Sequence, residues 1–169
     1  PVRRREDVRL LTGQGRFADD VSQQGQLYAA FVRSPVAHGI IRNVNLAAAS
    51  AAAGVVDVFT GDDLAAAGIG HIVARWPKYQ SAQIQSARPL HTPRPGLAQG
   101  KVRHVGEAVV MVVAETLGQA RGAADLVTLE IDELPAAVTI ADAIAPGAPE
   151  VWEDAPGNIG QVWHRGDRQ

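Results

Sequence analysis

The stretch that most restricts the fold is Ala108 to Ala114, seven consecutive residues without a polar side chain. Four of the seven are valine, and β-branched residues favour strands. A strand that lacks the usual polar alternation is one that is buried on both faces. Burial of such side chains contributes about 1.5–3 kcal/mol each, or on the order of 10 kcal/mol for the run. We therefore expect this strand at the centre of the core.

The residues after this strand predict a helix and then a second strand. Thr116 can cap a helix whose apolar stripe is Leu117, Ala120, Ala124 and Val127. From residue 127 the period changes to two, which is typical of a half-buried strand up to residue 132. Strand, helix and strand in this order form a βαβ unit, at about residues 107–132. We therefore expect an α+β fold with a mixed sheet, in which these two strands are parallel neighbours.

The first half of the chain predicts further short elements. Strands are expected at residues 27–32, 39–45 and 55–59, and short helices at 46–53 and 64–67, with another at 140–144 after Thr139. Residues 74–101 contain four prolines and no period, which predicts a long loop. Its side chains could contact another chain, line a substrate funnel or have no role; the residues concerned are Trp76, Tyr79, Leu90 and His91, with Arg75, Lys78, Arg88 and Arg94 around them.

Composition excludes several classes of function. The 169 residues carry 16 basic and 18 acidic side chains, so the charge gives no reason to expect nucleic-acid binding. The absence of cysteine excludes disulfides and iron–sulfur ligation by this chain. The sequence shows no signal-peptide pattern and no apolar run near the ~20 residues of a membrane span. We expect one soluble, cytoplasmic domain.

No group of residues has a convincing catalytic or ligand pattern. His104 and Glu107 flank Gly106, and Glu107 could act as a base in a small hydrolase; the alternative is a strand-end carboxylate paired with Arg103. Asp62 and Asp63 are more typical of helix capping than of acid–base chemistry. The five histidines have no ligand spacing, and Gly13-Gln14-Gly15 lacks the third glycine of a dinucleotide loop. We therefore predict no catalytic, cofactor-binding or metal-ligating residue; the histidines are His38, His71, His91, His104 and His164.

An ordered series of motifs resembles a known family, the molybdenum hydroxylases, which include xanthine dehydrogenase, aldehyde oxidase and aerobic carbon monoxide dehydrogenase. The similarity is to the N-terminal hammerhead domain of their large subunit, although many bacterial relatives have proline where this chain has Ala108. The motifs are Leu10-Leu11-Thr12-Gly13, Val32-Arg33-Ser34-Pro35-Val36-Ala37-His38, the stretch from Ala53 to Leu64, Val105-Gly106-Glu107, Ala114-Glu115-Thr116, Glu130 to Pro135, and Asn158 with His164-Arg165-Gly166-Asp167.

This resemblance implies a domain organisation and a role. Residues 1–145 would form the hammerhead domain, with an N-terminal arm at 1–20 that packs on the cofactor-bearing part. Residues 146–169 would be a linker to a molybdenum-cofactor domain that the sequence lacks. The complete assembly would hydroxylate an aldehyde, purine, N-heterocycle or CO. It would use molybdopterin, 2Fe-2S clusters and FAD, none of them bound by this chain. The partners of this chain would be a molybdenum-binding domain or subunit and subunits that carry the iron–sulfur clusters and FAD. The isolated chain would be inactive. The alternative is a free-standing binding or scaffold protein that uses loop 74–101, Trp152 and Trp163.

Overall fold

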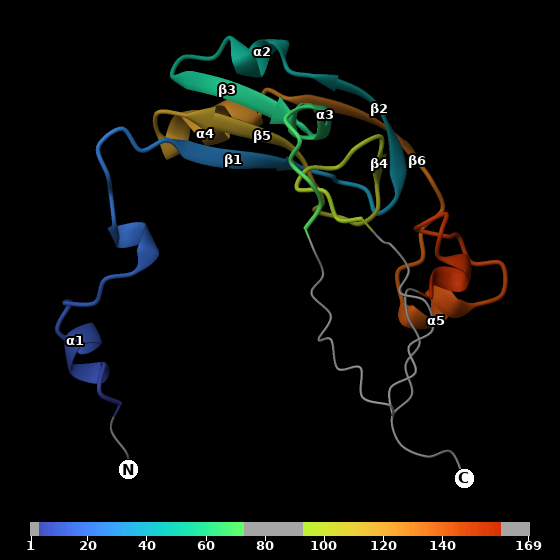
Figure 1. Cartoon of the computed structure of the whole chain (residues 1–169), viewed down its shortest axis with the longest axis horizontal. Helices are drawn as coiled ribbons and strands as arrows, with labels where there is room; N and C mark the ends of the chain where they lie inside the picture. The colour runs from blue at the N-terminus through green and yellow to red at the C-terminus, as the bar shows by residue number, and fades with distance from the viewer. Residues whose placement is uncertain (1–3, 73–92, 160–169) are drawn as a thin grey trace.

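The apolar run forms the central strand of a three-stranded sheet. The computed structural model describes residues 4–72 and 93–159. In it, β5 (Ala108–Ala114) lies between β1 (Tyr28–Arg33) and β3 (Val55–Thr60), and both pairings are antiparallel (Figure 1). Val112 pairs with Ala30 on one side and Val58 on the other. The run is thus held from both edges, as expected of a core strand.

A second three-stranded sheet contains the remaining strands. β2 (Gly39–Asn45) lies between β4 (Lys101–Val102) and β6 (Thr128–Glu133), again with antiparallel pairing. Leu129 and Ile131 are half-buried while their neighbours in β6 are exposed, which confirms the predicted period of two. The strands alternate between the sheets along the chain: β1, β3 and β5 form one, and β2, β4 and β6 form the other.

The predicted parallel pairing within residues 107–132 is wrong, although strand, helix and strand follow one another as expected. β5 and β6 belong to different sheets, and β6 pairs with β2. The physical reason is that β1 and β3 occupy both hydrogen-bonding edges of β5, so β6 has no free edge of β5 to join. Because every pairing among the described strands is antiparallel, the predicted mixed sheet is wrong as well, whereas the α+β class is confirmed.

The helices are short, and three of them begin directly after a threonine; two of these threonines, Thr116 and Thr139, were expected. Side chains of Thr60, Thr116 and Thr139 accept hydrogen bonds from the first turns of α3 (Gly61–Ala66), α4 (Leu117–Ala124) and α5 (Ile140–Ile144). α4 packs on β1 and β5 through Ala120 and Ala123, whereas Leu117 is 39% exposed and lies outside the buried stripe. The other helical segments are α1 (Asp7–Leu11), η1 (Ala18–Asp20), α2 (Ala47–Ser50) and η2 (Pro156–Asn158).

The core is aliphatic and includes the end of the predicted loop. Val109, Val110 and Val112 are at most 2% exposed. Leu97 and Ala98 are also buried, and the Ala98 amide donates to the Ala108 carbonyl oxygen at 2.7 Å. The predicted loop at residues 74–101 is therefore wrong at its end, where Leu97 and Ala98 are buried in the core and Lys101 belongs to β4. The predicted contact residues Trp76, Tyr79, Leu90, His91, Arg75, Lys78 and Arg88 lie outside the described residues.

Apolar side chains remain exposed on the N-terminal arm. The chain before β1 extends away from the sheets (Figure 1). Leu11 and Phe17 are 86% and 66% exposed, and residues 4–13 of the arm contain no buried side chain. Among the helices in the described part of the chain, none is long and apolar enough to cross a membrane.

Candidate functional site

The predicted site at residues 103–107 is a tight turn that leads into β5. Gly106 has φ +82°, a left-handed conformation that favours glycine, and no atom lies within 4 Å of the position that a Cβ would take there. The Glu107 carboxylate accepts a hydrogen bond from the Arg103 amide at 2.5 Å, and the Glu107 amide donates to the His104 carbonyl oxygen at 3.2 Å. The carboxylate therefore closes the turn on itself.

The structure brings His104 and Glu107 together, as the sequence suggested, but in unequal surroundings. His104 Nδ1 lies 3.7 Å from Glu107 Oε2; the His104 side chain is 69% exposed and the Glu107 side chain 15%. A general base needs a free oxygen facing a substrate proton. Here the same carboxylate oxygen, Glu107 Oε2, accepts the hydrogen bond from the Arg103 amide and faces the His104 imidazole. This geometry supports a structural role for Glu107.

A second turn, between β1 and β2, docks against the first. The Ser34 amide donates to the Glu107 carbonyl oxygen at 2.8 Å, and the Arg33 guanidinium donates to the Gly106 carbonyl oxygen at 2.8 Å. His38 is 6% exposed, and its Nδ1 lies 2.8 Å from the carbonyl oxygen of Pro135. Arg33 and His38 thus hold this turn against backbone carbonyl oxygens of segments far away in sequence.

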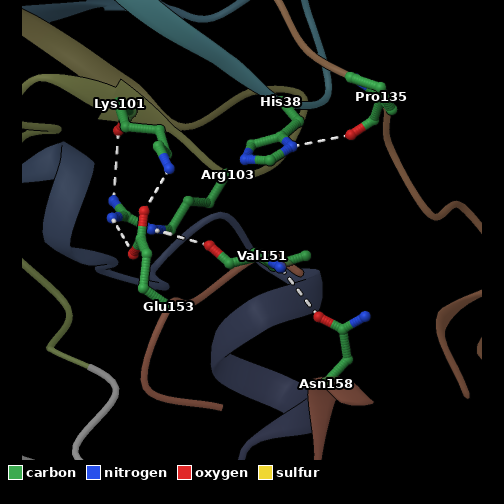
Figure 2. A network of polar contacts seen from close by, with 7 residues as sticks. All are labelled: His38, Lys101, Arg103, Pro135, Val151, Glu153 and Asn158. Carbon is green, nitrogen blue, oxygen red and sulfur yellow. Dashed lines mark hydrogen bonds and ion pairs between the residues drawn. The ribbon is translucent and has the colours of Figure 1, made fainter. Parts of the chain in front are cut away.

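Arg103 organises a cluster on which the tail lies, and this cluster was missed at the sequence level (Figure 2). Its guanidinium lies 3.8 Å from the centroid of the Trp152 ring, a cation–π contact. Its Nε donates to the Val151 carbonyl oxygen at 3.3 Å. Glu153 pairs with Lys101 and lies 3.9 Å from Arg103, and the hydrogen bond from Lys101 lowers the pKa of Glu153. In the sequence, only the basic residues at 101 and 103 and the acidic, aromatic tail after them could have indicated this contact.

Asn158 fixes the other end of this tail segment. Its side-chain amide donates to the carbonyl oxygens of Ala143 and Pro149, each at 2.9 Å, and its side-chain oxygen accepts from the Val151 amide at 2.9 Å. Its φ of +56° places it in a conformation that asparagine tolerates better than most residues. The first residues of the expected linker, up to 159, are therefore docked on the domain; Trp163 and the motif at 164–167 lie outside the described residues.

The carboxylates at the start of α3 act as the sequence predicted. Asp63 accepts hydrogen bonds from the Thr60 hydroxyl at 2.6 Å and the Thr60 amide at 2.7 Å, which lower the pKa of Asp63. Asp62 accepts one from the Gln99 side chain at 3.3 Å. The two carboxylates thus cap the helix and contact the segment that precedes β4, and they do not form an acid–base pair.

A hollow of about 430 Å³ opens beside the 103–107 turn. Its wall includes Arg33 from the first turn, Arg94 and Pro95 from the segment before β4, and Trp152 from the tail. Within residues 4–72 and 93–159, no three His, Asp or Glu side chains converge in a way that could hold a metal ion.

Fold and site together define a class: an α+β domain of two small antiparallel sheets whose polar side chains mainly secure turns and a docked tail. Residues 12–135 match the sequence model of the family described as "Aldehyde oxidase and xanthine dehydrogenase, a/b hammerhead domain". The chain therefore belongs to this family. The large subunit of nicotine 6-hydroxylase from Paenarthrobacter nicotinovorans is 40% identical over 161 residues, which are 94% of this chain and 18% of that protein.

Other relatives give the same result. The xanthine dehydrogenase molybdenum-binding subunit of Escherichia coli O157:H7 is 33% identical over 144 residues, 85% of this chain and 18% of that one. The crystal structure of a Cu,Mo-CO dehydrogenase superimposes with a TM-score of 0.73 at 31% identity, over 90% of this chain and 18% of that chain. The chain thus corresponds to the hammerhead domain of molybdenum hydroxylase large subunits and spans about a fifth of their length. The predicted family and the hammerhead fold are confirmed.

Proposed function

We propose that this chain is the non-catalytic hammerhead part of a molybdenum-dependent hydroxylase, and that it docks on the part that carries the cofactor. The observation that carries this proposal is the exposed apolar arm. Val8, Leu11 and Phe17 are each at least 66% exposed although they belong to a domain with a well-packed core. Exposed apolar side chains gathered on one segment mark an interaction surface. The corresponding partner surface would lie in the four fifths of the relatives that this chain does not cover.

The proposal assigns the chemistry to the rest of the assembly. One relative is named as a large subunit and another as a molybdenum-binding subunit, and a matched crystal structure is that of a Cu,Mo-CO dehydrogenase. Molybdopterin, 2Fe-2S clusters and FAD would be held by those other parts, which would insert oxygen from water into the substrate. The proposal assigns no cofactor-binding residue to this chain. The predicted boundary near residue 145 and the predicted cytoplasmic location remain predictions.

The substrate class that we favour is an N-heterocycle other than a purine. The relative named for nicotine hydroxylation is 40% identical, against 33% for the relative named for xanthine. Nicotine, quinoline, xanthine, benzaldehyde and CO form a panel that distinguishes the classes named above. Preference of the complete assembly for xanthine, an aldehyde or CO over the first two compounds would contradict this assignment without affecting the docking role.

The docking role can be tested on the large subunit that contains this sequence. Leu11→Asp and Phe17→Asp should leave the melting temperature of the 169-residue chain unchanged, because both side chains are exposed. In the large subunit, both changes should reduce molybdenum content and assembly with the other subunits, measured by metal analysis and native mass spectrometry. Val105→Asp, at a residue 63% exposed outside the arm, is the matched control. Full assembly of both arm variants would refute docking through the arm.

Two alternatives from the sequence have their own tests. A small hydrolase built on His104 and Glu107 would show ester hydrolysis by the isolated chain that disappears in Glu107→Gln. A free-standing scaffold protein would purify from its source as a 169-residue species bound to a partner without molybdenum. Metal, flavin or pterin bound stoichiometrically to the isolated chain would refute its non-catalytic role.

A further inference from the structure

The hollow beside the 103–107 turn has the size and construction of a ligand site. Its volume of about 430 Å³ lies within the roughly 300–1,000 Å³ typical of small-molecule sites. Five separate segments line it: residue 33, residue 72, residues 93–96, residues 103–104 with 106–108, and residues 151–152. The hydrogen bond from Arg33 to Gly106 and the stacking of Arg103 on Trp152 fix three of these segments relative to one another. The hollow is therefore formed by tertiary contacts and not by a single loop.

The charges around the hollow are unbalanced. Arg33, Arg94 and Arg103 line it together with one carboxylate, that of Glu107. The Arg103 guanidinium stacks on Trp152 and lies 3.9 Å from the Glu153 carboxylate. The Glu107 carboxylate accepts a hydrogen bond from the Arg103 amide and faces His104. Among the described residues, neither Arg33 nor Arg94 has an acidic partner within ion-pair distance. The Arg33 guanidinium donates one N–H to the Gly106 carbonyl oxygen and lies 5.7 Å from the centroid of the Phe31 ring, but its other N–H groups, like the guanidinium of Arg94, have no acidic partner among the described residues. Such planar donors match the geometry of an oxyanion.

Apart from His104, the rest of the wall is mostly apolar and partly aromatic. Trp152, Pro95, Ile72 and Ala108 contribute side chains that offer no charge. An inorganic oxyanion would leave this surface in contact with water, whereas a flat ring would cover it and gain burial energy. The chemistry that fits both parts of the wall is an oxyanion attached to a planar apolar body.

We propose that this hollow binds a small aromatic carboxylate. The carboxylate pairs with Arg33 and Arg94, and the ring lies against Trp152 and Pro95. This binding site goes beyond the docking role proposed above and does not depend on it, because none of its lining residues belongs to the N-terminal arm.

Titration calorimetry on the 169-residue chain tests the site with three probes. Benzoate has the ring and the charge, benzamide has the same shape without the charge, and inorganic phosphate has the charge without the ring. Benzoate should bind about tenfold more tightly than either of the others, because each lacks one half of the recognition. Absence of benzoate binding, or equal affinity for benzamide, would overturn the proposal. Equal affinity for phosphate and benzoate would refute the aromatic part of the proposed ligand.

Variants then locate the binding. Arg94→Gln should weaken benzoate binding about tenfold, since a charge-assisted hydrogen bond is lost. The Arg94 side chain makes no ion pair within the described residues, so its loss should leave the melting temperature unchanged. Arg33→Gln should also weaken binding, and a melting curve will show whether loss of its bond to Gly106 loosens the fold. Arg16→Gln, on the exposed arm, is the control. If Arg94→Gln binds benzoate as tightly as Arg16→Gln does, the proposed site is refuted.

Discussion

Val112 gives the strongest test of the fold, because its side chain is fully buried in β5, the strand that pairs with both β1 and β3. It is 0% exposed and lies between Ala30 and Val58. Val112→Ala removes two methyl groups, which costs about 1.6 kcal/mol in lost burial at ~0.8 kcal/mol per carbon. The cavity left behind raises the loss to about 2–3 kcal/mol. For a chain of this size the melting temperature should fall by about 5–10 °C.

Urea unfolding followed by circular dichroism measures this loss directly. The midpoint should fall while the slope with denaturant is unchanged, which marks a change in stability and not in the unfolded state. Val56→Ala is the matched control: it makes the same change on β3, where the side chain is 54% exposed, and should alter stability by at most about 0.5 kcal/mol. Val112→Asp should give insoluble or unfolded protein, because an unpaired carboxyl group cannot be accommodated there. Equal effects of Val112→Ala and Val56→Ala, or a cooperatively melting Val112→Asp variant, would refute a core centred on β5.

Three further predictions concern the turns and the tail. Thr60→Ala should cost about 1 kcal/mol at neutral pH through loss of the helix cap. Because the native pKa of Asp63 is lowered, the contribution of its carboxylate to stability is complete at neutral pH and is lost as the pH falls through that pKa. In urea unfolding, the stability difference between Thr60→Ala and wild type should therefore shrink below about pH 4. Arg103→Met should speed hydrogen exchange at residues 149–153, whereas Arg42→Met, which breaks an exposed pair with Asp132, should not; equal exchange in both variants would argue against the Arg103 cluster as the anchor. Gly106→Ala should cost about 1 kcal/mol in melting experiments through its positive φ alone, and an unchanged stability would contradict the left-handed turn.

Local pattern predicted the elements well because each strand or helix has its own signal. β2 and α5 match their predicted ranges, and β5 matches the apolar run. The threonine caps at Thr116 and Thr139 were predicted from single residues, since a hydroxyl at that position satisfies helix amides whatever the rest of the fold does. The structural interpretation of Asp62 and Asp63 follows from the same local physics.

Pairing between strands could not be predicted in this way, because it depends on which edges are free. The sequence does not show that β1 and β3 take both edges of β5, so the βαβ interpretation placed β6 beside the wrong strand. Leu97 and Ala98 have no period around them, and their burial depends on Gly61, where a side chain would lie 2.5 Å from the Ala98 carbonyl oxygen. The docked tail likewise depends on Arg103, whose partners are about 50 residues away in sequence.

The alternation of strands between the two sheets determines when the domain can form during translation. β1 and β3 have no partner in the described chain until β5, the last of their sheet in sequence, has left the ribosome. β2 waits in the same way for β4 and β6. Nascent chains that end before residue 108 thus carry unpaired strand edges and no closed core, a state prone to aggregation. The domain should consequently fold late and nearly at once, near the end of its own synthesis.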